Sequence, residues 1–143
     1  MLREPKNDLI HLLGILESAS KVAEYAEGFS TADEFLHANH EMNYNASLTL
    51  IAVIGESIGK LSDLATEALT DLPLRRIRGM RNRIVHDYVG VDSQIVFDTI
   101  TMDLWLLKAR VQGFLEKQIQ AGVFDPEELK VVRESHYYPR VTI

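Results

Sequence analysis

The chain has 143 residues, of which 46% are hydrophobic and 25% are charged, and it contains no cysteine. This length and composition are typical of one globular domain with a buried core. The lack of cysteine excludes a disulfide framework and a metal site built on thiolates. No apolar run approaches the roughly 20 residues that span a bilayer, and the first residues lack the apolar core of a signal peptide. We therefore expect a single domain over residues 1–143 in a cytoplasmic protein.

The formal net charge is −6, but the charge is unevenly distributed. Residues 74–88 carry a local charge of +4, which leaves −10 on the rest of the chain. A confined cationic segment in an acidic protein predicts a focused anion site, whereas a broadly basic protein would bind nucleic acid unselectively. The cations of this segment are Arg75, Arg76, Arg78, Arg81 and Arg83.

The sequence of the first half of the chain predicts three helices. Apolar residues at intervals of three and four predict an amphipathic helix over about residues 7–27, which Gly28 ends. A short helix over about residues 32–37 follows. A longer helix over about residues 40–61 is apolar around nearly its whole circumference between residues 48 and 59, so we expect it at the centre of the core.

Two features of this third helix predict close contacts. Ala52, Gly55 and Gly59 recur on one side and would let another helix approach. Glu56 is the only ionisable residue of the apolar stretch, and a buried carboxylate needs a partner because an unpaired buried charge is costly.

The second half of the chain begins with a connector over residues 66–71. Pro73 suits the first turn of a helix that carries the arginines from residue 74 to about Tyr88, and Gly90 stops it. A final long helix is predicted over about residues 95–120.

The last segment, over about residues 123–143, is expected to lie at the periphery. Asp125 and Pro126 predict the start of a short helix, and the tail from Tyr137 onward is expected to be extended and could dock on a partner. No strand alternation or internal repeat is present. The prediction is an all-α fold, a compact bundle of four to five helices with a short C-terminal helix and an extended tail.

On an ideal helix, the arginine-rich segment has two faces. One is a polar stripe of Arg75, Arg78, Asn82 and His86; the other combines Ile77, Ile84, Val85 and Tyr88 with Arg81. An arginine on a packed face must meet an anion. Geometry alone favours an ion pair between Arg81 and Glu56, and the alternative is an arginine that reaches from a seam toward a phosphate.

His86 gives this helix a group that can exchange protons near neutral pH. RNA carries its own nucleophile, the 2′-hydroxyl, beside each phosphate. A nuclease that uses this hydroxyl needs a base for its proton and a cation for the charge that develops on phosphorus, and His86 and Arg81 can fill these roles. A metal site at His37 and His40 with Glu41 is a weaker interpretation, because the sequence offers no clear third ligand for the two histidines and contains no cysteine.

Residues 81–88, Arg-Asn-Arg-Ile-Val-His-Asp-Tyr, resemble the Arg–four residues–His–x–Tyr signature of the HepT-like toxins in the HEPN superfamily. Gly79-Met80 before this signature and Val89-Gly90-Val91-Asp92 after it also fit, as does the upstream segment over residues 54–61. The resemblance covers most of the chain.

The resemblance implies a HEPN-like helical ribonuclease that acts as a homodimer, with its signature helices meeting across a cleft. Such proteins are toxins of type VII toxin–antitoxin systems that cleave RNA, with tRNA as a target, without a metal or other cofactor. Their antitoxin is a minimal nucleotidyltransferase that transfers AMP from ATP to the signature tyrosine, here Tyr88. Phosphate at Tyr88, two turns from Arg81 on a continuous helix, would compete with RNA phosphates.

The predicted roles are as follows. His86 is the general base or acid, Arg81 stabilises the transition state, and Asn82 orients the phosphate or His86. RNA is also positioned by Arg78 and Arg83. Glu56 and Asp87 are supporting residues.

Two further hypotheses remain open: a non-catalytic helical subunit that binds a nucleotidyltransferase or its substrate, and a plain structural bundle. The complete signature favours catalysis, because a docking surface needs no histidine base. Arg81 and His86 differ by about 140° around an ideal helix, which favours a site composed across a two-fold interface.

Overall fold

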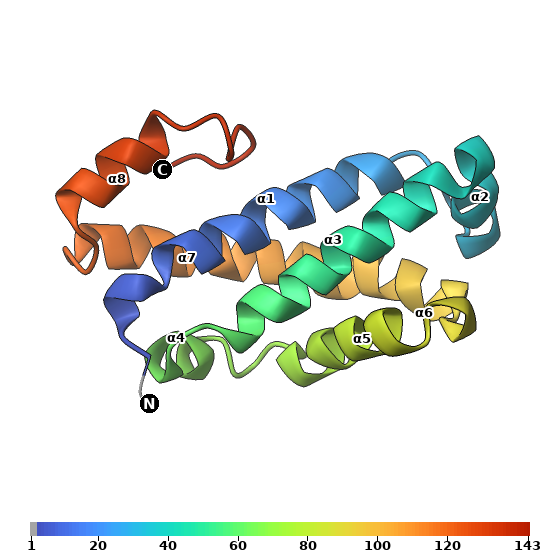
Figure 1. Cartoon of the computed structure of the whole chain (residues 1–143), viewed down its shortest axis with the longest axis horizontal. Coiled ribbons are helices and arrows are strands. Elements are labelled where there is room, and N and C mark those ends of the chain that lie inside the picture. Colours follow the sequence, from blue (N-terminus) through green and yellow to red (C-terminus); the bar gives the residue numbers. More distant parts are fainter. Residues whose placement is uncertain (1–2) are drawn as a thin grey trace.

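Four long helical elements run side by side along the length of the molecule in the computed structural model, which describes residues 3–143 (Figure 1). They are α1 (Leu9–Ala26), α3 (Met42–Gly59), α5 (Leu74–His86) and a continuous C-terminal element. This last element comprises α6 (Ser93–Asp98), a π-helical segment (Thr99–Leu104) and α7 (Trp105–Gln120). Within the described residues there is no strand, so the predicted all-α bundle is confirmed.

Three shorter helices connect or cover the long ones: α2 (Ala32–His37), α4 (Asp63–Ala68) and α8 (Pro126–Arg133). Three 3-10 turns complete the order, at Pro5–Asn7, Ala38–Glu41 and Tyr88–Gly90. In residues 3–143 no helix combines the length and apolar character that a membrane crossing requires.

Helix α4 lies where a connector was expected. The Ser62 hydroxyl caps it by accepting a hydrogen bond from the Ala65 amide at 3.2 Å, and donates its own proton to the buried Asp8 carboxylate at 2.6 Å. Asp8 also accepts from the Ser62 amide. A six-residue helix with a single buried residue shows no apolar periodicity, so the sequence pattern could not reveal it.

The core is built mainly from α3 packed between α1 and α5, with α7 packed against α1. Helix α1 contributes fully buried residues along most of its length, including Leu9, Leu12, Leu13 and Ile15. Helix α3 buries Leu48, Ile51 and Ile54, but it is not surrounded as predicted. The expected position in the core is confirmed to the extent that α3 lies between α1 and α5, but one face remains exposed, with Val53 at 43% exposure.

The C-terminal tail does not lie free but packs on α1. Arg140 donates hydrogen bonds to Glu17 at 2.8 Å and to Glu24 at 3.0 Å. Glu17 is buried, and the Arg140 backbone amide donates to it as well. The extended tail predicted from sequence therefore docks on its own chain.

Candidate active site

Helix α5 presents the arginine-rich segment with one side buried and the other open. Its buried residues are Leu74, Ile77, Met80 and Ile84. The polar stripe predicted from the sequence is exposed over its whole length, at Arg75, Arg78, Asn82 and His86. The helix thus carries its cations on the surface of the bundle, beside α3.

The helix ends at His86, two residues earlier than predicted. The backbone of Asp87 leaves the helical region (φ −147°, ψ 58°), and its amide makes the last helical bond to the Arg83 carbonyl at 2.8 Å. Tyr88 begins the following 3-10 turn, which the Gly90 amide closes on the Asp87 carbonyl at 3.1 Å. Tyr88 therefore does not continue the helical stripe of Arg81, and this part of the prediction was wrong.

Asp87 has a structural place in this turn. A Cβ on Gly90 would collide with the Asp87 carboxylate, so the aspartate side chain folds over the glycine. The exposed Asp87 therefore lies over the 3-10 turn that begins at Tyr88.

Arg81 lies in the seam where α5 crosses closest to α3. A Cβ on Gly55 would overlap the Arg81 side chain, so the predicted close approach at the small residues of α3 is confirmed. The Arg81 guanidinium pairs with Glu56 at 3.0 Å and donates to the Asn82 amide oxygen at 2.9 Å.

The expected ion pair exists, but Glu56 is not buried. Its side chain is 50% exposed, and Lys60 lies 3.8 Å from its second oxygen. Arg81 retains 32% exposure of its side chain. An ion pair with this exposure is weak, because water screens it and solvates both partners. Arg81 is thus oriented by Glu56 without being sequestered by it.

His86 closes the helix as an exposed residue. Within residues 3–143 its imidazole has no hydrogen-bond or ion-pair partner, so both ring nitrogens face solvent. The Asn82 oxygen is used by Arg81, which leaves the amide NH₂ of Asn82 to donate toward a phosphate or toward His86. Because both residues belong to α5, helical geometry separates Arg81 from His86 by about 140°.

Tyr88 is held from α3 by a residue that the sequence analysis did not single out. Its hydroxyl hydrogen-bonds the side-chain oxygen of Asn45, while 48% of the tyrosine remains exposed. Asn45 precedes Glu56 by eleven positions, which is about 20° around an ideal helix. One face of α3 therefore holds both signature residues, Arg81 through Glu56 and Tyr88 through Asn45. Counting eleven residues back from Glu56 leads to Asn45 on the same face of the helix, and this spacing was visible in the sequence.

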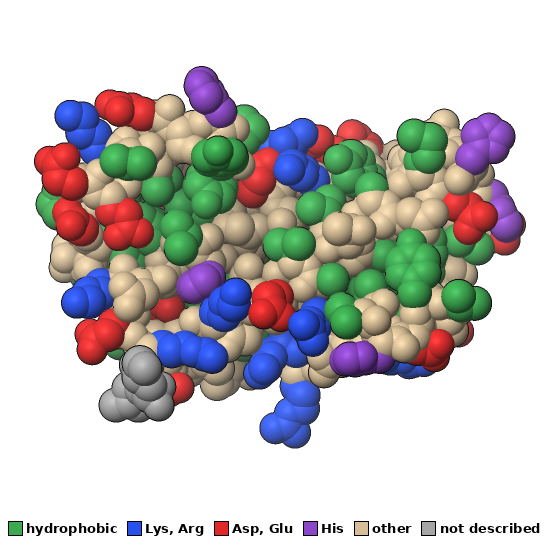
Figure 2. All heavy atoms as spheres, in the orientation of Figure 1, with side chains coloured by type: hydrophobic (Ala, Val, Ile, Leu, Met, Phe, Trp, Pro, Cys, Tyr) green, Lys and Arg blue, Asp and Glu red, His purple; other side chains and the backbone are tan. Residues whose placement is uncertain are grey.

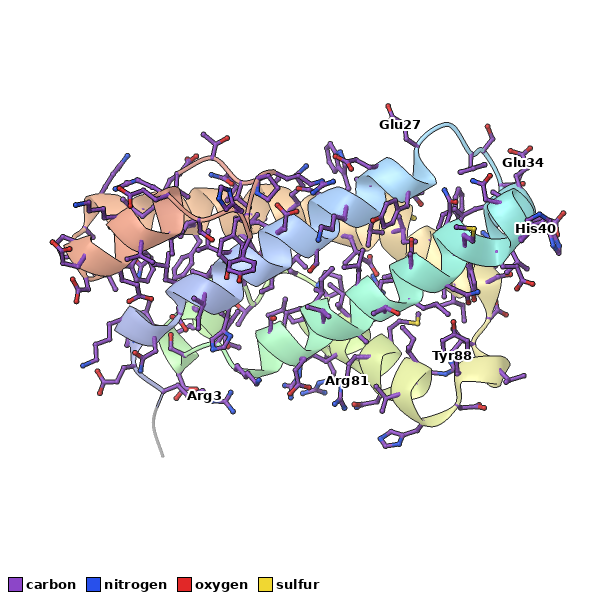
Figure 3. All side chains as sticks on the ribbon, turned by 45° about the horizontal axis from the view of Figure 1, so that its top comes forward. Arg3, Glu27, Glu34, His40, Arg81 and Tyr88 are labelled. Atoms are coloured by element: carbon purple, nitrogen blue, oxygen red, sulfur yellow. The ribbon has the colours of Figure 1, made fainter. Side chains whose placement is uncertain are left out.

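Figure 3 shows Arg81 and Tyr88 along one edge of the bundle, with Arg3 on the same edge beyond Arg81. Their neighbour Tyr44 on α3 is mostly buried, and burial together with the nearby Tyr88 raises the pKa of its hydroxyl. The edge thus joins cationic, amide and phenolic groups from α3 and α5.

The five arginines of α5 have different surroundings. Arg76 makes two hydrogen bonds to the largely buried Asp103 of the π-helical segment, at 2.9 and 2.7 Å, and these bonds raise the pKa of Arg76. This pair joins α5 to the C-terminal element. Arg75, Arg78 and Arg83 are exposed, and within residues 3–143 no carboxylate lies within ion-pair distance of them.

Histidine and carboxylate residues do not gather at this edge. Over the described range no group of three or more of them could hold a metal ion. His37, considered above as a ligand, instead lies 3.3 Å from Asp33 one turn away on α2. The groups present at the site are those of acid–base and cationic chemistry.

The HepT-like ribonuclease family matches residues 15–114, which is most of the chain and includes α5 and the Tyr88 turn. The chain belongs to the HepT-like ribonuclease family. No solved structure matches it.

Individual relatives agree with this assignment. The chain is 26% identical over 117 residues to "Putative RNase TTE0752" of Caldanaerobacter subterraneus subsp. tengcongensis, a match that covers 82% of this chain and 99% of the relative. It is also 26% identical over 113 residues to "Putative RNase MJ1216" of Methanocaldococcus jannaschii, covering 78% and 91%. A further relative there, "Gamma-glutamylcyclotransferase and putative RNase MJ0434", is 28% identical over 112 residues, about half of its length. Family and relatives support a ribonuclease.

Proposed function

We propose that this HepT-like protein is a metal-independent endoribonuclease toxin of a type VII toxin–antitoxin system that cleaves RNA, with tRNA as its target. The observation that carries the proposal is the set of Arg81, Asn82 and His86 on α5, in which Arg81 is half-buried against Gly55 and Glu56 of α3 while Asn82 and His86 are exposed. Family membership supports the RNA substrate.

In the proposed reaction, His86 accepts the proton of a ribose 2′-hydroxyl. The 2′-oxygen forms a bond to the adjacent phosphorus, and the bond from phosphorus to the 5′-oxygen breaks. The departing 5′-oxygen takes up a proton from water, and the products are a 2′,3′-cyclic phosphate and a 5′-hydroxyl. Arg81 exchanges Glu56 for the phosphate and stabilises the extra negative charge on its oxygens, while Asn82 donates a hydrogen bond to it.

The site is proposed to be shared between the two subunits of a homodimer. The edge that holds Arg81 also carries exposed apolar residues: Met42 and Val53 on α3, Val85 on α5 and Val89 in the following turn. Figure 2 shows hydrophobic side chains gathered over neighbouring parts of α3 and α5 beside the basic ones. Packing two such edges together would cover this apolar surface and bring His86 of one subunit toward Arg81 of the other.

The proposed regulation is AMPylation of Tyr88 by a cognate minimal nucleotidyltransferase. The tyrosine oxygen attacks the α-phosphorus of ATP, the bond to pyrophosphate breaks, and the phenolic proton leaves. The Tyr88 hydroxyl donates a hydrogen bond to Asn45, and this bond fixes the ring. The lone pairs of the hydroxyl oxygen are not used by the bond, so they are available to attack the α-phosphorus. The added phosphate would place negative charge at the C-terminal end of α5, the helix that carries the arginines.

The test of catalysis compares the purified chain with Arg81→Ala and His86→Ala variants on tRNA and on unstructured RNA. Loss of the base is expected to slow cleavage by about 10²–10⁴-fold, and loss of the arginine by about 10²–10³-fold. Unchanged thermal unfolding of the variants would show that the fold is retained. Absence of cleavage by the parent chain, with no growth defect on expression, would leave the non-catalytic subunit as the function.

A second test addresses Tyr88. Incubation with the proposed cognate nucleotidyltransferase and ATP is expected to add the mass of one or more AMP groups and to abolish cleavage. Tyr88→Phe should gain no mass. Asn45→Ala should be modified at an altered rate, because Tyr88 loses the hydrogen bond that holds its hydroxyl. A mass increase that persists in Tyr88→Phe would exclude Tyr88 as the modified residue.

A further inference from the structure

A groove of about 850 Å³ runs along α5 from Arg81 toward the N-terminal end of that helix. Its walls come from α3, α4, α5 and the N-terminal segment, and Arg81 and Asn82 form its end nearest the candidate active site. Tyr88, His86 and Arg83 do not line it. The groove therefore extends the site in one direction only, away from the Tyr88 turn.

Cations dominate this groove. Five basic side chains line it, against the two carboxylates of Glu56 and Asp63: Arg3, Lys60, Arg75, Arg78 and Arg81. Glu56 is already shared by Arg81 and Lys60. Figure 2 shows the basic side chains gathered along this edge of the bundle, and Figure 3 shows Arg3 and Arg81 on it.

Arg75, Arg78 and Arg81 follow one another at three-residue intervals on α5. Residues at this spacing are neighbours on a helix surface, with Cβ atoms about 5–6 Å apart. The Arg78 guanidinium lies across Gly59 of α3, within 3.3 Å of where a Cβ would stand. In the described chain neither Arg75 nor Arg78 has a hydrogen-bond or ion-pair partner, so this row presents unoccupied donors to the groove.

Gly79 supplies an independent observation. A glycine inside a helix lowers its stability relative to alanine, and it is usually explained by close packing at the missing side chain. At Gly55 that explanation holds, because Arg81 occupies the space. At Gly79 nothing lies within 4 Å of the position of a Cβ, and this open position faces the groove. Gly113 of α7 is equally open, so the missing side chain alone indicates no ligand. The open position at Gly79 differs because it lies in the same groove as Arg75 and Arg78.

We propose that this groove binds the phosphate backbone of the RNA strand on one side of the cleaved bond, with Arg78 and Arg75 contacting successive phosphates that lead away from Arg81, and with the strand passing over Gly79. The inference rests on the ribonuclease function proposed above. In this proposal, the RNA on one side of the cleaved bond lies on the α4 side of Arg81. The RNA on the other side of the bond lies near Arg83 and the Tyr88 turn.

The experiment uses the full chain and a short fluorescent 2′-O-methyl RNA. This probe keeps every phosphate but lacks the nucleophile, so binding is measured without cleavage. The first pair of variants is Gly79→Glu and Gly113→Glu. Both glycines lie inside helices with nothing near their Cβ positions, and both changes add one negative charge. Only Gly79→Glu is expected to weaken binding, by roughly 10-fold, since a carboxylate in the groove repels phosphate.

The second pair is the double variant Arg75→Gln/Arg78→Gln and, as its control, Arg133→Gln on α8. For a single strand, each lost phosphate contact reduces the slope of log affinity against log salt by about 0.7. The double variant should therefore lower the slope by about 1.4 between about 50 and 200 mM salt, and the control should leave it unchanged.

Cleavage of unmodified RNA, measured in parallel, separates this inference from the function on which it rests. If the parent chain cleaves RNA but both groove variants bind the probe as their controls do, the groove assignment is overturned and the ribonuclease stands. If the groove variants lose affinity as expected while the parent chain cleaves nothing, the groove stands and catalysis fails. Failure of the parent chain to bind the probe would overturn the groove as well.

Discussion

Arg76 and Arg81 are five residues apart on one helix, yet their ion pairs differ in kind. Arg76 makes two hydrogen bonds to Asp103, whose side chain is only 12% exposed. Arg81 contacts a Glu56 side chain that is 50% exposed and also lies near Lys60. A two-point contact to a shielded carboxylate fixes α5 on the C-terminal element. A single contact to a solvated carboxylate orients the arginine and can be exchanged for a phosphate.

This difference divides the arginine-rich segment into structural and functional parts. Sequence alone presented five equivalent cations. The partner residues on other helices decide which of these cations are paired. Within residues 3–143 they leave Arg75, Arg78 and Arg83 without an ion-pair partner, and Arg81 with a solvated one. Substitutions in the two parts should therefore have different effects on stability and on RNA cleavage.

The largest expected effect distinguishes Arg81→Ala from Arg76→Ala in RNA cleavage. Arg81→Ala should reduce the rate by about 10²–10³-fold with little change in thermal unfolding. Arg76→Ala should instead lower the midpoint of thermal unfolding while the folded fraction cleaves RNA at the parental rate. Both quantities are measured on the same samples below the unfolding transition. A folded Arg76→Ala protein that does not cleave would place Arg76 in the site.

The second prediction breaks the seam that positions Arg81. Gly55→Ala forces a methyl group against the Arg81 side chain, and overpacking of this kind costs about 1–3 kcal/mol of unfolding free energy. Gly113→Ala is the matched control, because its open position allows the helix to gain up to about 1 kcal/mol. Urea denaturation compares them. Equal stability of the two variants would contradict the close approach of α3 and α5.

The third prediction compares the two carboxylates. Glu56→Gln should change the unfolding free energy by no more than about 1 kcal/mol, since its pair with Arg81 is solvated. The same change should raise the affinity for 2′-O-methyl RNA, because Arg81 loses its competing anion. Asp103→Asn should destabilise the fold more than Glu56→Gln and leave RNA affinity unchanged. The reverse order of stabilities would refute the division proposed here.

The smallest expected effect concerns the tail and pH. Hydrogen bonding to Arg140 lowers the pKa of Glu24 below its ordinary value of 4.5 in the folded protein. A carboxyl with a lowered folded pKa stabilises the folded state above its unfolded pKa and loses that contribution as the pH falls through the folded value. The protection of the amides around Arg140 against hydrogen exchange, measured relative to their intrinsic exchange rates, should therefore decrease below pH 4.5. A Glu24→Gln variant should lack this part of the pH dependence, and persistence of the full effect would assign it to another group.

The sequence was sufficient for the parts of the fold that depend on periodicity and local signals. The long helices and the Asp125–Pro126 start of α8 were predicted because each shows in a short window. It failed for one face of α3, where apolar residues on an uncovered face look the same in sequence as those of a core helix. The position at which α5 ends was also predicted two residues too late, because no residue near Asp87 indicates that its backbone leaves the helical region.

The site was predicted on α5 but not across helices. Arg81 and Glu56 were paired correctly because each was the only charge on an otherwise apolar face. Asn45, the pairing of Arg76 with Asp103 and the groove at Gly79 depend on contacts between distant segments. Such contacts follow from the crossing of α3 and α5 and from the π-helical segment, neither of which has a pattern within one helix.

The central claim is that a complete site combines Arg81 of one subunit with His86 of the other. Mixing inactive Arg81→Ala and His86→Ala proteins after partial unfolding and reassembly tests it directly. In a shared site, half of the dimers are mixed and each contains one intact site, so cleavage should return to about a quarter of the parental rate. If each site lies within a single subunit, no mixture contains an intact one, and activity that stays at the level of the separate variants would contradict the claim.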